Sequence, residues 1–207
     1  MFRNPNKEAL TYMEKKYGEK FSYIGPTGST NGGDTSSILV SCSSLPGAEI
    51  LVRFTRQSTG EFQFLDNFMA FYYQQDVCDL LKDIATEIYG KCKISYSVIR
   101  GPLPDYINKD TTFQEYIEAD VVPIPAVIVV SADASIASKD EDIQQLRDRL
   151  NKSKLFISGR IYYANESSYS LIDASTISLS TGPKNWCLLF CSFSIDSNGE
   201  FKYIDWK

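Results

Sequence analysis

The sequence predicts an α+β fold, in which mostly antiparallel sheet is covered by three or four helices. Two observations predict it. Between Asp76 and Ser97, an amphipathic helix is followed by Gly90 and then by a strand that alternates apolar and polar residues. Alternating runs separated by short turns at 37–65 indicate an antiparallel meander. No stretch carries a specific chemical motif, so the sequence indicates the fold more directly than the function.

The stretch from Asp76 to Ser97 contains a helix and a strand that each have one apolar side. Gly90 follows the helix and can take the left-handed conformation that ends it. A one-sided helix and a one-sided strand must share a core. The inward residues are Val77, Leu80, Leu81, Ile84 and Ile88 on the helix, and Cys92, Ile94 and Tyr96 on the strand.

The 207 residues suffice for one large domain or two small ones, and a chain of this length folds without metals or disulfides. We expect two similar α+β halves, residues 1–100 and residues 101–207, packed closely together. The segment at 100–110 contains two prolines and a glycine and interrupts the pattern, so we place the boundary there.

The first half begins with a helix that Asn4 caps and Gly18 ends, with Leu10, Met13 and Tyr17 facing inward and Ala9 beside them. A glycine-containing loop at 26–34 lacks the lysine and hydroxyl residues of a phosphate-binding loop. Six aromatic residues between 62 and 73 suit the core better than a stacking groove, and periodicity does not decide whether 68–73 is helix or strand. The predicted strands are 21–25, 37–43, 49–56 and 61–65.

The second half contains two helices, each introduced by a capping-box pattern, Thr112 with Glu115 and Ser138 with Glu141. The second of these helices turns Ile143, Leu146 and Leu150 inward. A turn at 196–199 joins the last two strands and lacks the ligand spacing of a calcium loop. The predicted strands are 126–131, 155–164, 169–178, 186–195 and 201–206.

Charge and composition argue against several function classes. A net charge of -5 disfavours sequence-independent nucleic-acid binding, and the apolar run at 121–130 is too short for this chain itself to insert into a membrane. The chain has no histidine, which excludes Ser-His-Asp and Cys-His catalysis and histidine-ligated metals. We therefore predict no catalytic residue, no metal site and no cofactor. Five cysteines without CxxC spacing suit small buried side chains better than disulfides.

The outer face of the helix after Asp76 carries four acidic residues three or four positions apart, with Lys82 beside them. Like charges at this spacing do not stabilise a helix, so they serve either solubility or the binding of a basic partner. We call them the acidic ridge, and they are the candidate partner-binding residues: Asp76, Asp79, Asp83 and Glu87.

The opening helix and strand read NPNKEALTYMEKKYGEKFSYIG, and a later segment reads FLDNFMAFYY. In these two segments the chain resembles a family of uncharacterised lipoproteins of Gram-positive bacteria. The resemblance covers about the first hundred residues. It implies an extracytoplasmic α+β module held by a lipid anchor upstream, although this chain contains no lipobox cysteine. It carries no functional residue over.

Three functions remain open at this stage. The first is a non-catalytic binding module of the cell envelope, whose partner is a protein or an envelope ligand. The second is an acidic intracellular protein of the immunity type, which binds a basic partner through the acidic ridge. The third is a carboxylate-based hydrolase, which requires two acids facing each other across a pocket, one of them shielded from water.

Overall fold

The computed structural model describes residues 4–27, 34–98, 101–119, 124–130, 136–174, 177 and 185–207. The chain forms two compact units, each described separately below. Unit 1 comprises residues 1–73 and 99–116, and unit 2 comprises residues 74–98 and 117–207. The predicted α+β class is confirmed, because both units combine helices with mainly antiparallel sheet.

Unit 1 is built on a four-stranded antiparallel meander in the order β1-β2-β3-β4. Two of its reversals place a glycine in the left-handed region, Gly47 at φ 83° and Gly60 at φ 84°. Both lie in the turns that the sequence predicts, and the predicted loop at 26–34 falls mostly outside the described residues. The strands are β1 (Phe21–Pro26), β2 (Thr35–Cys42), β3 (Ile50–Arg56) and β4 (Phe62–Asp66).

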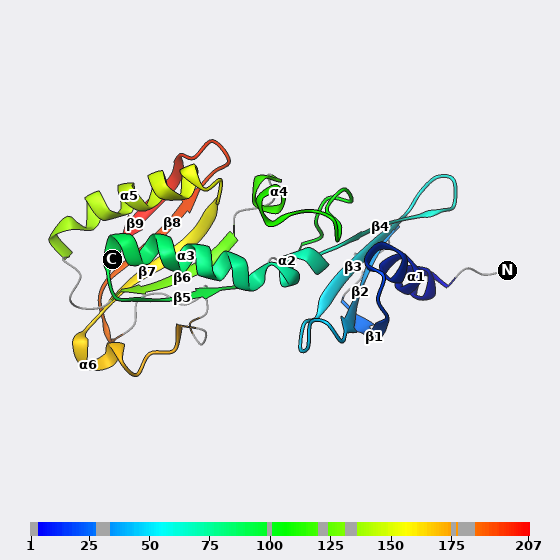
Figure 1. The fold of residues 1–207 in the computed structure, drawn as a ribbon, viewed down its shortest axis with the longest axis horizontal. Helices are drawn as coiled ribbons and strands as arrows, with labels where there is room; N and C mark the ends of the chain where they lie inside the picture. Colours follow the sequence, from blue (N-terminus) through cyan, green and yellow to red (C-terminus); the bar gives the residue numbers. More distant parts are fainter. Residues whose placement is uncertain are drawn as a thin grey trace. The chain divides into compact units, whose positions relative to one another are not determined.

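Helix α1 (Pro5–Tyr17) lies across one face of this sheet (Figure 1). Asn4 caps it by accepting from the backbone N–H of Asn6 at 3.1 Å, and Gly18 ends it at φ 75°, as predicted. The helix buries one stripe because its small and apolar residues recur at helical spacing. Residues buried between α1 and the sheet include Ala9, Met13, Tyr17, Val40, Val52 and Phe54.

The segment after β4 forms a short helix, α2 (Phe68–Tyr72), which settles the assignment that periodicity leaves open. Phe68 is buried, and its ring stacks on that of Tyr17 at 4.1 Å between centroids. Tyr72 is 55% exposed, whereas the other five aromatic residues of the 62–73 cluster are buried or half-buried. The core interpretation of that cluster therefore agrees with the structure.

Unit 2 contains a five-stranded sheet in the order β5-β6-β7-β8-β9. Its strands are antiparallel except for β6 and β7, which are parallel and are connected through the 3-10 turn η1 (Ile136–Ser138) and helix α5 (Lys139–Lys152). Gly159 lies in a tight site, because an added Cβ would lie 3.0 Å from the Phe193 ring and from the Ala126 carbonyl oxygen, so these neighbours would have to shift to admit a larger residue. The strands are β5 (Cys92–Tyr96), β6 (Ile124–Val130), β7 (Ile157–Ala164), β8 (Cys187–Ile195) and β9 (Phe201–Trp206).

Helices α3 (Gln74–Tyr89) and α5 pack side by side on one face of the second sheet (Figure 1). Gly90 ends α3 at φ 70°, as predicted. Leu80 and Ile88 lie at the edge of the predicted apolar stripe and are half-buried. The residues that α3 and α5 bury include Val77, Leu81, Ile84, Ile143, Leu146 and Leu150.

The opposite face of the second sheet is partly covered by α6 (Glu166–Tyr169) and the residues after it. Tyr169 packs with Val129, Tyr162 and Phe190 of the sheet. The predicted strand at 169–178 is wrong over residues 169–174, which form the end of α6 and a turn, and most of its remainder lies outside the described residues. Tyr169 and Ala174 are buried against the sheet and Ile172 packs beside them, so this segment lies on the sheet rather than within it.

The capping-box predictions have different outcomes. Before helix α4 (Phe113–Glu118), the Thr112 N–H donates to Glu115 Oε2 at 2.7 Å and the Glu115 N–H donates back to Thr112 Oγ1 at 3.3 Å. Before α5, Ser138 makes no side-chain cap and its hydroxyl instead bonds Asp142 Oδ2 at 2.8 Å. That prediction is wrong because Ser138 ends the 3-10 turn η1 with φ -90° and ψ 4°, whereas a capping residue usually has an extended backbone.

The division into halves at residue 100 also needs correction. The chain leaves unit 1 after Tyr73, returns at residue 99 and leaves again after Tyr116. Helix α3 and strand β5 therefore belong to unit 2, with the strands of the second sheet. The proline-containing segment marks a loop within unit 1, since prolines break regular structure inside a unit as well as between units. The two sheets also differ in topology, because only the second contains a parallel pair.

Leu81→Ala should lower the free energy of unfolding by about 2–5 kcal/mol, because the side chain is 1% exposed and its removal leaves a cavity under α3. Urea unfolding followed by circular dichroism measures the loss. Asp83→Ala, on the exposed side of the same helix, is the matched control and should change stability by about 0.5 kcal/mol or less. Equal losses in the two variants would contradict the packing of α3.

Candidate functional site

The structure places all four residues of the acidic ridge on the outer side of α3, where every one of them is exposed. Val77, Leu81 and Ile84 are buried on the opposite side of the helix. The predicted orientation of the helix is therefore confirmed, whereas the binding of a partner by the ridge stays a prediction.

Two ridge residues interact with neighbouring side chains. Glu87 Oε2 lies 2.9 Å from Arg149 Nη2 of α5, and Gln75 Nε2 donates to Asp79 Oδ1 at 2.9 Å. The Glu87 and Arg149 side chains are both more than half exposed, so the ion pair contributes little to stability. The ridge therefore presents its charge to solvent and contributes little to the stability of the fold.

Unit 1 contains a buried carboxylate that the sequence analysis does not single out. Asp66, the last residue of β4, is 1% exposed. Its Oδ1 accepts from the Tyr17 hydroxyl at 2.6 Å and from the Phe68 N–H at 2.9 Å. Its Oδ2 lies 3.0 Å from Lys16 Nζ and 3.1 Å from the Tyr12 hydroxyl. A buried charge needs this many partners, because leaving water is costly.

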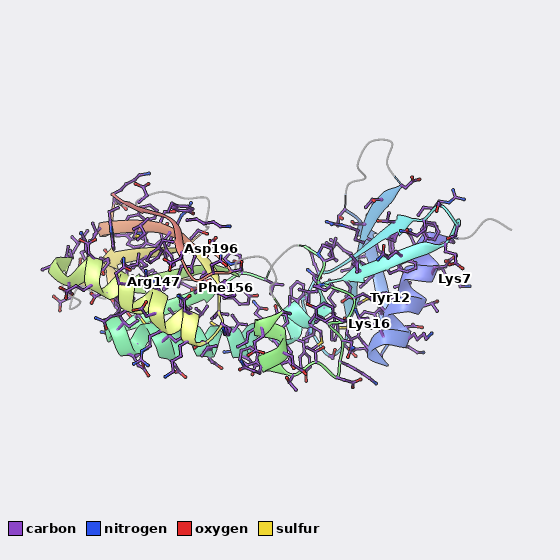
Figure 2. The ribbon with its side chains drawn as sticks, turned by 90° about the horizontal axis from the view of Figure 1, so that it is seen from above. Lys7, Tyr12, Lys16, Arg147, Phe156 and Asp196 are labelled. Atoms are coloured by element: carbon purple, nitrogen blue, oxygen red, sulfur yellow. The ribbon has the colours of Figure 1, made fainter. Side chains whose placement is uncertain are left out.

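The spacing of α1 brings these donors to one carboxylate. Tyr12 and Lys16 lie one turn apart and bond each other at 3.0 Å (Figure 2). The Tyr12 hydroxyl also lies 3.0 Å from Asp105 Oδ1, so its single proton serves either Asp66 or Asp105. Asp105 is 67% exposed and marks the outer end of the network.

Burial and the nearby Asp66 charge raise the pKa of both Tyr12 and Tyr17 well above the ordinary tyrosine range. Both phenols therefore stay protonated and act as hydrogen-bond donors at neutral pH. Because both Asp66 oxygens are occupied by donors from α1 and α2, the carboxylate is engaged in holding the unit together.

A signal for Asp66 exists in the sequence. Phe62, Phe64 and Asp66 alternate along β4, which places the acid on the same inward face as the two phenylalanines. A carboxylate in phase with core residues indicates a buried charge, and the lysine and tyrosines of the opening helix supply its partners.

A second feature of unit 1 is a surface depression of about 430 Å³ in the segment between β5 and α4. Tyr106 is 66% exposed there, whereas Ile107 is 1% exposed and anchors the segment below. In the sequence, the prolines and glycine of this segment indicate only a break between regular elements. Six residues line the depression: Tyr106, Ile107, Asn108, Asp110, Thr111 and Glu115.

Internal hydrogen bonds fix the shape of the depression. The Asn108 side chain accepts from the Asp110 N–H at 2.8 Å, and the Thr111 hydroxyl accepts from the Asn108 N–H at 2.9 Å. The Tyr73 hydroxyl donates a hydrogen bond to the Thr111 carbonyl oxygen at 2.6 Å. The lining is therefore an ordered surface that needs little rearrangement to bind a ligand.

Metal and thiol chemistry find little support in the described part of the chain. No group of three or more cysteine, aspartate or glutamate side chains there is arranged to hold a metal ion. None of the five cysteines, all of which lie in the described ranges, forms a disulfide bond. Burial raises the pKa of the Cys191 thiol to about 12. Asp196 accepts from the Glu200 and Asn198 N–H groups in the β8–β9 turn, which lowers its pKa.

Among the described residues, no helix is long and apolar enough to cross a membrane.

No protein-family model and no curated protein matches the chain. Among solved structures, the chain is similar to the crystal structure of a DUF5037 family protein from Ruminococcus gnavus. The two sequences are 12% identical, and the match covers 97% of this chain and 95% of the other, with a TM-score of 0.48. At this identity and TM-score the likeness carries no argument about function.

Tyr17→Phe should lower the free energy of unfolding by about 1.5–3 kcal/mol, because it removes a hydrogen bond to a buried carboxylate. Tyr163→Phe is the control, since the buried Tyr163 hydroxyl has no hydrogen-bond partner among the described residues. Removal of the Tyr163 hydroxyl should leave the free energy of unfolding unchanged or slightly higher. Urea unfolding at neutral pH measures both, and equal losses would show that the Asp66 network contributes nothing beyond packing.

Proposed function

We propose that the protein is a non-catalytic binding module of the cell envelope. The observation that carries the proposal is the depression of unit 1, which combines an exposed aromatic ring with polar side chains on an ordered loop. Small-molecule sites combine a concave surface with a few fixed polar groups in this way.

The buried acid of unit 1 favours binding over hydrolysis. A carboxylate-based hydrolase needs a shielded acid that exchanges a proton with its substrate. Asp66 is shielded, but its two oxygens accept from Tyr17, Lys16 and a backbone N–H. A substrate would have to displace the bonds that hold α1 in place.

The envelope location rests on the resemblance of the first hundred residues to Gram-positive lipoproteins. In this proposal a lipid anchor lies upstream of the chain, and both units face the outside of the cell. The ligand is then a component that reaches the outer face of the membrane.

The location is tested in cells that carry the gene, with the protein expressed from its natural start. The protein should partition into the detergent phase, and protease added to intact cells should degrade it. A cytoplasmic protein of the same cells, which must stay intact, is the control. Recovery of the chain only in the soluble fraction of broken cells would contradict the proposal.

The acidic ridge supports a second candidate function, the capture of a basic protein. Its four carboxylates follow one line along the exposed side of α3, where about 1.5 Å of rise per residue spreads them over three turns. A basic helix or strand could meet several of them at once, and opposite charges accelerate such encounters. An intracellular immunity-type protein would use the same surface.

The triple variant Asp79→Lys, Asp83→Lys and Glu87→Lys should unfold within about 1 kcal/mol of the wild type, because exposed charges contribute little to stability. If the ridge captures basic partners, the variant should also lose salt-sensitive binding to a lysine-rich helical peptide, measured by fluorescence anisotropy. A control variant with the same change in charge elsewhere should keep this binding. It replaces three exposed acids of unit 1 by lysine: Glu14, Glu49 and Glu61. Equal binding by both variants would remove the ridge as a specific surface.

A further inference from the structure

The depression of unit 1 has a lining of mixed chemistry. Tyr106 contributes an exposed aromatic ring, while Asn108 and Thr111 contribute an amide and a hydroxyl. Asp110 and Glu115 add carboxylate oxygens. Such a lining suits a ligand that has an apolar face and many groups able both to donate and to accept hydrogen bonds.

The hydrogen bonds that each polar group of the lining already makes narrow the class of ligand further. Glu115 Oε2 is already bonded to the N–H and the hydroxyl of Thr112, at 2.7 and 2.8 Å. Within the described residues, no hydrogen bond or ion pair engages the carboxylate of Asp110. The Asn108 amide donates one N–H to the Tyr106 carbonyl at 3.1 Å and keeps a second, while the Thr111 hydroxyl accepts from the Asn108 N–H and keeps its own proton to donate. A cation could use neither of these donors, and one exposed, solvated carboxylate attracts a cation only weakly.

We propose that this depression binds a short neutral saccharide, with one sugar ring stacked on Tyr106 and its hydroxyls bonded to Asn108, Asp110 and Thr111. This proposal rests on the proposed binding function and names its ligand class. A volume of about 430 Å³ lies in the lower part of the range of small-ligand sites, roughly 300–1,000 Å³. The two carboxylates, and the lack of a cationic side chain among the described residues of the lining, disfavour acidic sugars.

The test is an NMR titration of the full chain, ¹⁵N-labelled, with four probes: maltotriose, tri-N-acetylchitotriose, trigalacturonate and a lysine-rich peptide. At least one of the two neutral trisaccharides should shift the backbone resonances of residues 106–111 saturably at concentrations up to about 10 mM, which suffices for a site with a Kd near 1 mM. Trigalacturonate should not shift them.

Two variants locate the binding. Tyr106→Ala should weaken the binding of the neutral saccharide about tenfold, because it removes stacking on an aromatic ring, and a tenfold change in Kd corresponds to about 1.4 kcal/mol. Tyr203→Ala is the matched control, an exposed tyrosine of β9 in unit 2, and should bind as the wild type does. Asp110→Asn should keep saccharide binding within a few fold, because an amide also bonds to hydroxyls. Unchanged resonances elsewhere in unit 1 show that each variant folds.

Three results would overturn the saccharide proposal: no shift with either neutral probe, equal binding by Tyr106→Ala, or shifts produced only by trigalacturonate or the peptide. Peptide shifts that disappear in Asp110→Asn would assign the depression to a cationic ligand, and the binding function would stand without the saccharide. These results are separate from a failure of the proposed envelope function, because that function is tested by the location of the protein in cells.

Discussion

The burial of the Asp66 charge is the constraint on which unit 1 depends. Its side chain accepts from Lys16 and Tyr17 of α1, which fixes the helix on the sheet. Its backbone carbonyl accepts from the Leu103 N–H at 2.7 Å, which fixes the start of the loop that forms the depression. One residue at the end of β4 therefore joins the helix, the sheet and the candidate binding surface, and a buried charge tolerates little error in the positions of its partners.

Periodicity predicts most of the fold, because each regular element of this chain buries one side. Helices α1, α3 and α5 and the meander of unit 1 follow directly from the spacing of their apolar residues. Periodicity fails around Tyr169, where a segment packs Tyr169 and Ala174 on the sheet without being one of its strands and leaves Leu171 85% exposed. It also does not reveal that α3 packs in unit 2, because an apolar stripe does not specify its partner. Periodicity also does not reveal that position 159 has little room for a side chain, because the Phe193 ring that limits the space is distant in sequence.

The candidate sites differ in how far local sequence determines them. The acidic ridge lies on one helix, so the spacing of Asp79, Asp83 and Glu87 suffices to place it. The Asp66 network joins residues about 50 positions apart, and only the phase of β4 hints at it. The depression depends on hydrogen bonds within an irregular loop, for which propensity gives no rule beyond the presence of turn residues.

The two candidate surfaces suit different kinds of recognition. The ridge consists of exposed carboxylates on a regular helix, so its attraction is long-range, sensitive to salt and tolerant of the partner's shape. The depression holds its polar groups within a loop anchored by Leu103 and Ile107, which favours short-range recognition of shape and hydrogen-bond pattern. The chain lacks histidine, the side chain whose ordinary pKa lies between pH 5 and 8, and the buried Cys191 titrates far above that range. Neither surface therefore contains the usual pH switch, so salt concentration rather than pH is the variable that separates binding at the ridge from binding in the depression.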